Sequence, residues 1–187
     1  MFLANASLII IFSGCNHEKY NATSTGFTKV LEYLEKSLGK DVEVDELRFI
    51  FNDDTADKNT AIRMISIEFQ SKSNQNQLER MTYTDKNGWG AIEPIQFSSD
   101  EDEVEMYDFE DEVNSLSLVK GDVLEKVYNN ALKKSSEQYS DRLMSSILID
   151  FKKGKDVIYE TTLKRGTGKR KTIIHFGFDK NGNLKKY

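Results

Sequence analysis

The sequence predicts an α+β fold made of two tandem units, each with one helix followed by an antiparallel sheet of three or four strands. Helical and then strand-like hydrophobic periodicity occurs twice along the chain, in the same order. The tetrapeptide Asp-Lys-Asn-Gly ends both halves, at residues 85–88 and 179–182, and Asn-Gly is a frequent tight-turn dipeptide. Hydrophobic residues make up 38% of the 187 residues, with 11 Phe and 8 Tyr, which is enough for a packed core.

These patterns divide the chain into five segments. Residues 1–14 have the short apolar run of a signal peptide, and residues 15–25 form a polar tether. The first αβββ unit spans residues 26–97 and the second spans residues 116–187. Residues 98–115 are the expected linker between the units.

The first unit begins with a helix whose apolar side chains share one face. Thr25 is the expected N-cap and Gly39 the expected stop. Three strands follow, in which large apolar side chains alternate with mostly polar ones. The expected core residues of the helix and the strands are Phe27, Val30, Leu31, Leu34, Leu38, Leu47, Phe49, Phe51, Ile65, Ile67, Phe69, Met81 and Tyr83.

The second unit repeats this order, with Asp122 near the start of its helix. Its expected core residues are Leu124, Val127, Tyr128, Ala131, Leu132, Ile147, Ile149, Phe151, Val157, Tyr159, Leu163, Ile174, Phe176 and Phe178. The opposite face of the strands is partly apolar, through Ile50, Leu148, Ile158 and Ile173. We expect the two halves to meet on this second face, or a ligand to bind between their sheets.

Charge is distributed unevenly along the chain. Residues 1–112 hold 10 Lys and Arg against 23 Asp and Glu, whereas residues 113–187 hold 16 against 8. Nine of the thirteen residues from 100 to 112 are acidic, which predicts an extended, solvated linker, although that stretch also contains aromatic residues. The asymmetry indicates either two halves that attract each other or two faces with different partners.

The first fifteen residues indicate where the protein acts. The segment Phe12-Ser13-Gly14-Cys15 follows the apolar run and contains the single cysteine of the chain. It resembles the lipobox of bacterial lipoproteins, which implies cleavage before Cys15 and lipidation of its thiol. The resemblance implies a protein anchored by lipid in the cell envelope, facing the periplasm or the cell surface, and we expect the outer rather than the inner membrane.

The order of elements after the tether also resembles PepSY-like and β-lactamase-inhibitor-protein-like modules of extracytoplasmic proteins. The likeness lies in the helix-plus-strands outline and in the aromatic-Asp-Lys-Asn-Gly ending, and no family-specific residue supports it. It implies an α+β binding module.

The residues available for catalysis are few. With Cys15 lipidated, the chain keeps no thiol, and His17 and His175 are its two histidines. We therefore expect no Cys-His pair, no Ser-His-acid triad, no metal site and no cofactor. Asp179 begins a run that resembles a calcium loop only in its first five positions. A hydrolase that uses carboxylates alone stays a minor alternative.

One concentrated basic segment remains, at residues 164–171, between two predicted strands. Its five cations are Lys164, Arg165, Lys169, Arg170 and Lys171. Three interpretations stay open: a solvated hairpin tip, a site for a phosphate, lipid or anionic glycan, or a contact with the acidic linker. Trp89, the single tryptophan, is either an exposed anchor or a buried core residue.

The sequence as a whole favours a non-enzymatic protein that recognises or inhibits another protein of the cell envelope. The expected binding face combines Trp89 with the basic hairpin. The alternative is a binder of a small anionic ligand, a lipid or a glycan. Nucleic-acid binding is not expected for an exported chain with a net charge of −5.

Overall fold

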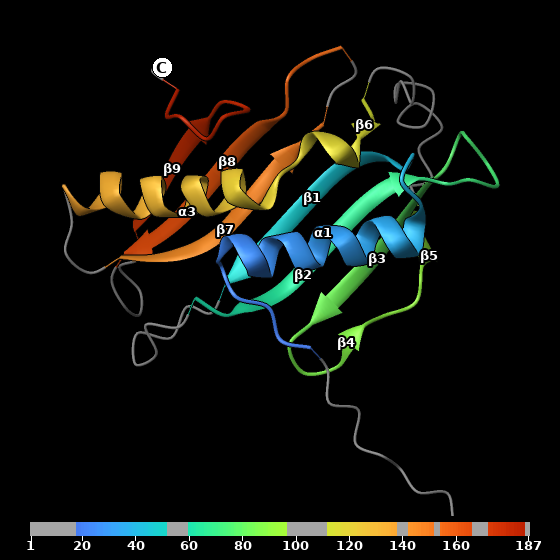
Figure 1. The fold of residues 1–187 in the computed structure, drawn as a ribbon, viewed down its shortest axis with the longest axis horizontal. Helices are drawn as coiled ribbons and strands as arrows, with labels where there is room; N and C mark the ends of the chain where they lie inside the picture. Colours follow the sequence, from blue (N-terminus) through green and yellow to red (C-terminus); the bar gives the residue numbers. More distant parts are fainter. Residues whose placement is uncertain are drawn as a thin grey trace, which may run out of the picture.

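In a computed structural model, two helices lie side by side across one face of a single antiparallel sheet (Figure 1). The structure describes residues 18–51, 60–96, 112–137, 142–151, 154–165 and 172–185. The α+β class is therefore confirmed, with more sheet than helix. Neither helix in these ranges has the length and apolar character that crossing a bilayer requires.

Among the described residues, the first half of the chain supplies one helix and five strands. These are α1 (Ser24–Leu38), β1 (Glu43–Phe51), β2 (Ile62–Gln70), β3 (Leu78–Thr84), β4 (Gly88–Trp89) and β5 (Glu93–Pro94). The second half supplies, again within the described ranges, another helix, one 3-10 turn and four strands. These are β6 (Asn114–Ser115), η1 (Leu116–Leu118), α3 (Gly121–Ser136), β7 (Arg142–Asp150), β8 (Ile158–Arg165) and β9 (Thr172–Phe178).

The strands of both halves join edge to edge in the order β4-β3-β2-β1-β7-β8-β9. At the centre, β1 and β7 run antiparallel, with Leu47 opposite Ile149 and Phe49 opposite Ile147. The expectation that the halves meet through the second faces of two sheets is therefore wrong. Pairing β1 with β7 satisfies the backbone groups of two strands that would otherwise be sheet edges.

The core lies between the helices and the sheet. Phe27 of α1 meets Phe49 edge to face, with ring centroids 5.1 Å apart. Tyr128 of α3 lies at the same distance from Phe51, a residue of the first half. All but three of the expected core residues are buried. Leu132, Ile174 and Phe176 are partly buried against the core, and the indole of Trp89 joins them there.

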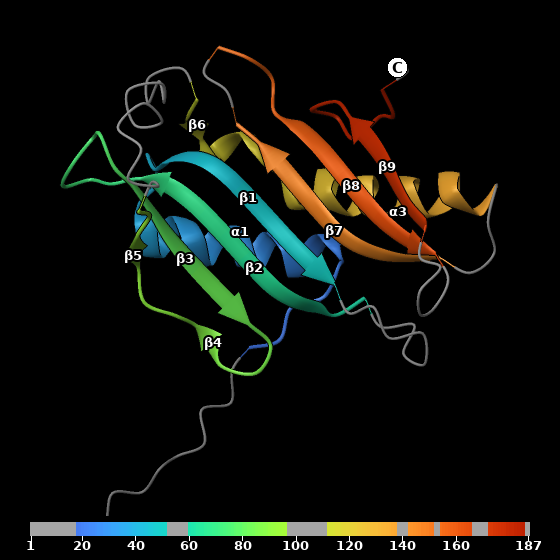
Figure 2. The same cartoon turned by 180° about the vertical axis from the view of Figure 1, so that it is seen from behind.

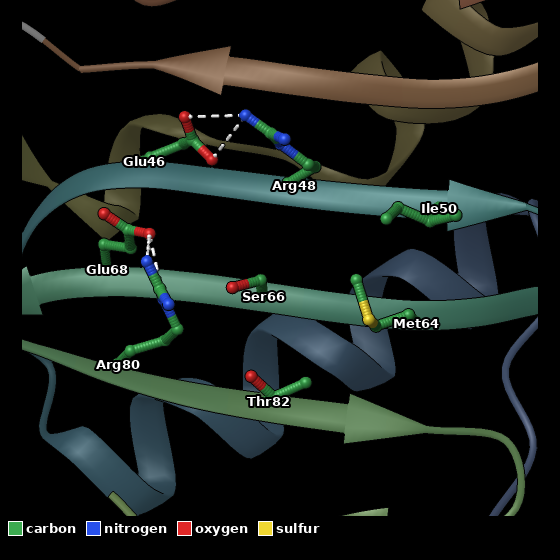
Figure 3. Close-up of a pocket in the computed structure, with 8 residues that line it drawn as sticks. All are labelled: Glu46, Arg48, Ile50, Met64, Ser66, Glu68, Arg80 and Thr82. Atoms are coloured by element: carbon green, nitrogen blue, oxygen red, sulfur yellow. Dashed lines mark hydrogen bonds and ion pairs between the residues drawn. The ribbon is translucent and has the colours of Figure 1, made fainter. Parts of the chain in front are cut away.

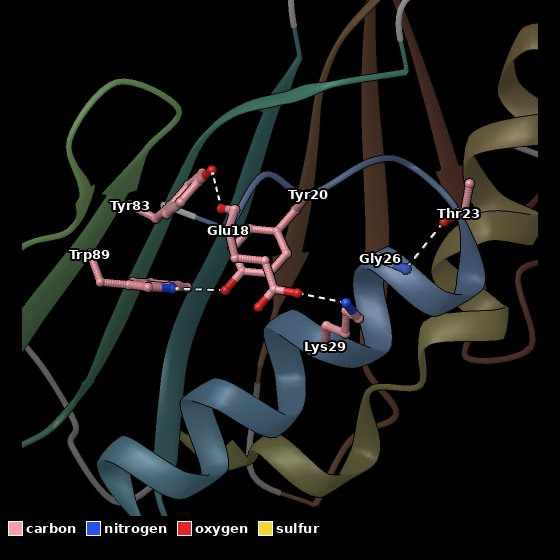
Figure 4. Close-up of polar contacts among 7 residues, drawn as sticks. All are labelled: Glu18, Tyr20, Thr23, Gly26, Lys29, Tyr83 and Trp89. Atoms are coloured by element: carbon pink, nitrogen blue, oxygen red, sulfur yellow. Dashed lines mark hydrogen bonds and ion pairs between the residues drawn. The ribbon is translucent and has the colours of Figure 1, made fainter. Parts of the chain in front are cut away.

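The ends of α1 show one confirmed and one wrong prediction. Gly39 ends the helix with a φ of 98°, a value that favours glycine. The N-cap is Thr23 and not Thr25: the Thr23 hydroxyl accepts a hydrogen bond from the backbone N–H of Gly26 (Figure 4). Asn21 pairs with Ala61 just before this cap, so the chain leaves the sheet and turns into the helix two residues earlier than expected.

Both Asp-Lys-Asn-Gly segments form tight turns. Their glycines, Gly88 and Gly182, have φ values of 72° and 71°. In the second turn the Asp179 carboxylate accepts hydrogen bonds from the backbone N–H groups of Asn181 and Asn183. These bonds favour the charged carboxylate and lower the pKa of Asp179.

The predicted linker is partly outside the described residues, but its C-terminal end belongs to the fold. Val113 is buried, and β6 pairs with β1. Residues 97–111 lie outside the described part of the chain.

Candidate functional site

The face of the sheet opposite the helices is the candidate surface (Figure 2). No described helix covers it, and its side chains come from the strand positions that alternate with the core. Three neighbouring rows run across the strands from β3 toward β9: Arg80-Glu68-Glu46-Asp150-Ile158, Thr82-Ser66-Arg48-Leu148-Glu160-Gly177 and Thr84-Met64-Ile50-Ser146-Thr162-His175. We call this surface the open face.

The open face has a hollow of about 410 Å³ over β1, β2 and β3 (Figure 3). Its lining is Glu46, Arg48, Ile50, Met64, Ser66, Glu68, Arg80 and Thr82. The charged side chains lie at one end of the hollow, and the apolar side chains Ile50 and Met64 lie at the other. The hollow therefore offers a polar and an apolar region side by side.

Two arginine–glutamate pairs define the charged end. The Arg80 guanidinium lies 2.6 Å from the Glu68 carboxylate, on the neighbouring strand. The Arg48 guanidinium contacts both carboxylate oxygens of Glu46 at 3.0 and 3.1 Å. Such exposed pairs contribute about 1 kcal/mol or less to folding. Their main effect is to hold both guanidinium groups in a fixed orientation.

The pairs also leave the arginines accessible. The side chains of Arg48 and Arg80 are 44% and 50% exposed, whereas those of Glu46 and Glu68 are 27% and 19% exposed. Each guanidinium therefore has N–H donors available beside its intramolecular partner. Accessible arginines next to half-buried apolar side chains such as Ile50 and Met64 are typical of protein-binding surfaces.

Trp89 lies elsewhere, on the helix side of the sheet edge formed by β3 and β4. Its indole stacks on Tyr33 of α1, with ring centroids 4.7 Å apart and planes 8° apart. Its Nε1–H donates to the hydroxyl of Tyr20 at 3.2 Å (Figure 4). Burial raises the pKa of Tyr20. The half-buried Trp89 thus fastens the segment before α1 to the sheet.

The same edge is tied by two further contacts. The Tyr83 hydroxyl donates to the backbone carbonyl of Glu18 at 2.9 Å, and Lys29 pairs with the Glu18 carboxylate at 2.6 Å. Burial also raises the pKa of Tyr83. These contacts anchor the described start of the chain against α1 and β3.

Of the cations in the predicted binding face, only the side chain of Lys164 lies in the described part of the chain, and the structure does not bring it near Trp89. Trp89 is on β4, at one edge of the sheet, whereas Lys164 is on β8, next to the strand β9 at the opposite edge. Lys164, opposite Ile173 on β9, is half-buried on the open-face side. The side chain of Arg165 and the residues Lys169, Arg170 and Lys171 lie outside the described part of the chain.

His175 lies on the open face, where its Nδ1 is 3.2 Å from the Thr162 hydroxyl. Within the described ranges, no three His, Cys, Asp or Glu side chains are placed to hold a metal ion. The cavity expected between two sheets has no counterpart there, because the strands form one sheet. Cys15 and His17 lie outside the described residues.

The alternation along each strand predicts that most residues of the hollow lie on the second faces of their strands, but it does not place Met64 there and does not bring these residues together. The i, i+2 spacing of Glu46 and Arg48 predicts a shared strand face. The Glu68–Arg80 pair depends on the register of β2 and β3, which the alternation alone does not give.

No protein-family model, curated protein or solved structure matches this chain. The function is therefore argued from the geometry of the open face and from the N-terminal sequence.

Proposed function

We propose that this chain is a lipid-anchored protein of the bacterial cell envelope that recognises another protein through the open face, without catalysing a reaction. The observation that carries the proposal is the open face itself. It combines accessible arginines, carboxylates and half-buried apolar side chains on one continuous surface.

The size of the open face supports this proposal. Six strands of at least seven residues lie side by side. With strands about 4.8 Å apart and a rise of about 3.3 Å per residue, they span roughly 600–700 Å². This is close to the roughly 800 Å² that each partner contributes to a standard protein interface.

A small anionic ligand, a lipid headgroup or a glycan is the alternative occupant, and the hollow favours it by size. Its volume of about 410 Å³ falls in the range of ligand sites. However, both guanidinium groups in the hollow already face carboxylates. This compensation weakens the attraction for a free anion, so a protein surface with both donors and acceptors is the better match.

Membrane anchoring rests on the lipobox resemblance of residues 12–15. Several acyl chains on Cys15 provide stable anchoring, because each buried methylene contributes about 0.8 kcal/mol. The Cys15→Ser variant tests this: the protein is expected to leave the membrane fraction and to lose incorporation of labelled palmitate. A variant that stays fully membrane-bound refutes lipid anchoring at Cys15.

We also infer that the chain consists of two tandem αβββ units. Support comes from the order helix-strand-strand-strand, which occurs once in each half. Further support comes from the two turns with nearly identical glycine φ values. In this interpretation β1 and β7 are equivalent first strands that pair with each other at the centre.

Capture from envelope extract, with residues 16–187 as bait, tests the proposed recognition. We expect one stoichiometric protein, whose capture falls about tenfold or more for the double variant Arg48→Ala/Arg80→Ala. The matched control is Lys134→Ala, which removes an ion-paired cation from α3. Capture that is equal for both variants excludes the charged end of the hollow, and a thermal shift with a glycan or lipid alone supports the alternative.

A further inference from the structure

The two edges of the sheet differ in how well they are protected against pairing with a further strand. At one edge, β3 is covered by the two-residue strands β4 and β5. β5 contains Pro94, the single proline of the chain, beside Glu93. Short strands, a proline and a charge are the usual means by which proteins prevent further strand pairing.

The opposite edge is β9, the outermost strand beside β8 (Figure 2). Its seven residues, Thr-Ile-Ile-His-Phe-Gly-Phe, include no Lys, Arg, Asp or Glu. They are rich in β-branched and aromatic side chains, which favour extended backbone. Only its C-terminal end is covered among the described residues, where Lys185 N–H donates to the Gly177 carbonyl at 2.8 Å.

That hydrogen bond shows which backbone groups of β9 point outward. In an antiparallel strand, alternate residues direct both N–H and C=O to the same neighbour. Because the Gly177 carbonyl points away from β8, the backbone groups of His175 and Ile173 do so as well. Neither residue has a backbone partner on that outer side within the described part of the chain.

Apolar side chains lie on both sides of this free edge. Ile173 is 57% exposed on the open-face side. Ile174 and Phe176 are partly buried on the helix side. An added strand can therefore pack alternate side chains on both faces while its backbone bonds to His175 and Ile173.

The charge of the residues around β9 indicates which kind of strand would pair with this edge. Residues 164–187 contain eight Lys and Arg against one Asp. Pairing β9 with the β9 of a second copy brings together two stretches that each carry this excess of positive charge. Like charges therefore oppose self-pairing, and an acidic strand is attracted.

We propose that β9 accepts an extended acidic segment of a partner protein as an additional antiparallel strand. The backbone N–H and C=O groups of Ile173 and His175 form four hydrogen bonds with it. Its carboxylates are attracted by the net positive charge of residues 164–187. This edge is separate from the hollow of the open face, so the proposal does not depend on the function proposed above.

Peptide binding to the full chain in a mild non-ionic detergent tests the proposal. The probe is a fluorescein-labelled peptide of alternating Glu and Val, about ten residues long, which is enough to span a strand. We expect binding that weakens with salt. A Lys-Val peptide and a Glu-Val peptide N-methylated at alternate residues are each expected to bind about tenfold more weakly or not at all.

Two substitutions of His175 distinguish the contribution of its backbone N–H to peptide binding from that of its side chain. His175→Pro removes the outward N–H without removing a hydrogen bond to β8, and it should lower peptide affinity about tenfold. His175→Val keeps the backbone donor and should bind like the wild type. If His175→Pro does not fold, the N-methylated peptide still tests the same hydrogen bonds.

Three results overturn the proposal. They are equal binding of the N-methylated peptide, equal binding of the Lys-Val peptide, and concentration-dependent dimerisation that His175→Pro abolishes. The last result would show that the β9 edge pairs with a second copy of this chain.

Discussion

Tyr159 is fully buried under α3, and its hydroxyl has no hydrogen-bond partner within the described ranges. Burial raises the pKa of this phenol, with a smaller contribution from the charge of Asp122. Burying a hydroxyl without a hydrogen-bond partner costs desolvation free energy, and no hydrogen bond in the folded state offsets that cost.

Tyr159→Phe removes that hydroxyl and keeps the ring. We expect the free energy of unfolding to stay the same or to rise by up to about 1 kcal/mol. Urea unfolding measures it, with Tyr83→Phe as the control, because the Tyr83 hydroxyl donates to the Glu18 carbonyl. A loss of more than about 1 kcal/mol in Tyr159→Phe contradicts the prediction and indicates a partner such as a buried water.

The type of residue at position 89 could not show whether Trp89 is an exposed binding anchor or part of the core. An aromatic residue beside a glycine turn suits an exposed anchor and a packed edge equally well. Only the neighbours decide between them, and they are Tyr20, Tyr33 and Tyr83, the first two from outside the sheet.

At the scale of elements, the start of α1 depends on its cap. Thr23→Ala removes the bond to the Gly26 N–H and should destabilise the fold by about 1 kcal/mol. Thr25→Ala, at an exposed helical position, should cost nothing or stabilise slightly. Thermal unfolding of both variants tests the cap, and a larger loss for Thr25→Ala contradicts it.

The two helices meet where α3 begins. A Cβ at Gly121 would lie 2.7 Å from the Ser24 carbonyl oxygen and 2.8 Å from the Thr28 backbone nitrogen, both in α1. Since backbone cannot move aside cheaply, Gly121→Ala should destabilise the protein by about 1–3 kcal/mol. The measurement is urea unfolding.

Gly154 provides the matched control for Gly121. It has open space around its Cβ position but a φ of 69°, so Gly154→Ala should cost only about 1 kcal/mol of backbone strain. If Gly121→Ala costs no more than Gly154→Ala, the helices are not in close contact at this point.

At the scale of the whole molecule, one sheet and one core imply one unfolding transition. β1 and β7 pair across the halves, and Tyr128 packs against Phe51. We expect calorimetry to give a single peak whose calorimetric and van't Hoff enthalpies agree. Two separate peaks would show that each half folds on its own.

Stability should also fall at high pH. Burial raises the pKa of Tyr20, Tyr83, Tyr128 and Tyr159 above the ordinary value near 10. Above that value the unfolded chain loses tyrosine protons before the folded chain does, so the free energy of unfolding decreases as pH rises.

Urea unfolding between pH 8 and about 11 measures this effect. Tyr159→Phe should show a shallower decrease than the wild type, because one raised pKa is removed. Equal slopes for the two proteins contradict the assignment of Tyr159 to this effect.

The sequence by itself determined most local features. Period-two alternation identified the core residues of the long strands, and period 3.6 identified the buried faces of both helices. Gly39, Gly88 and Gly182 marked a helix end and two turns, because each needs a positive φ. These features depend on neighbours within a few residues, so a single chain reveals them.

Tertiary structure alone decided how the halves join and where the candidate surfaces lie. Alternation says which face of a strand is buried but not which strand lies beside it. The β1–β7 pair therefore turned two expected sheets into one and placed Trp89 far from Lys164, on strands near opposite edges. The register of β1, β2 and β3 brought the Glu46–Arg48 and Glu68–Arg80 pairs together on the open face. Contacts between residues about one hundred positions apart are long-range hydrogen-bond pairings, and local sequence patterns do not encode them.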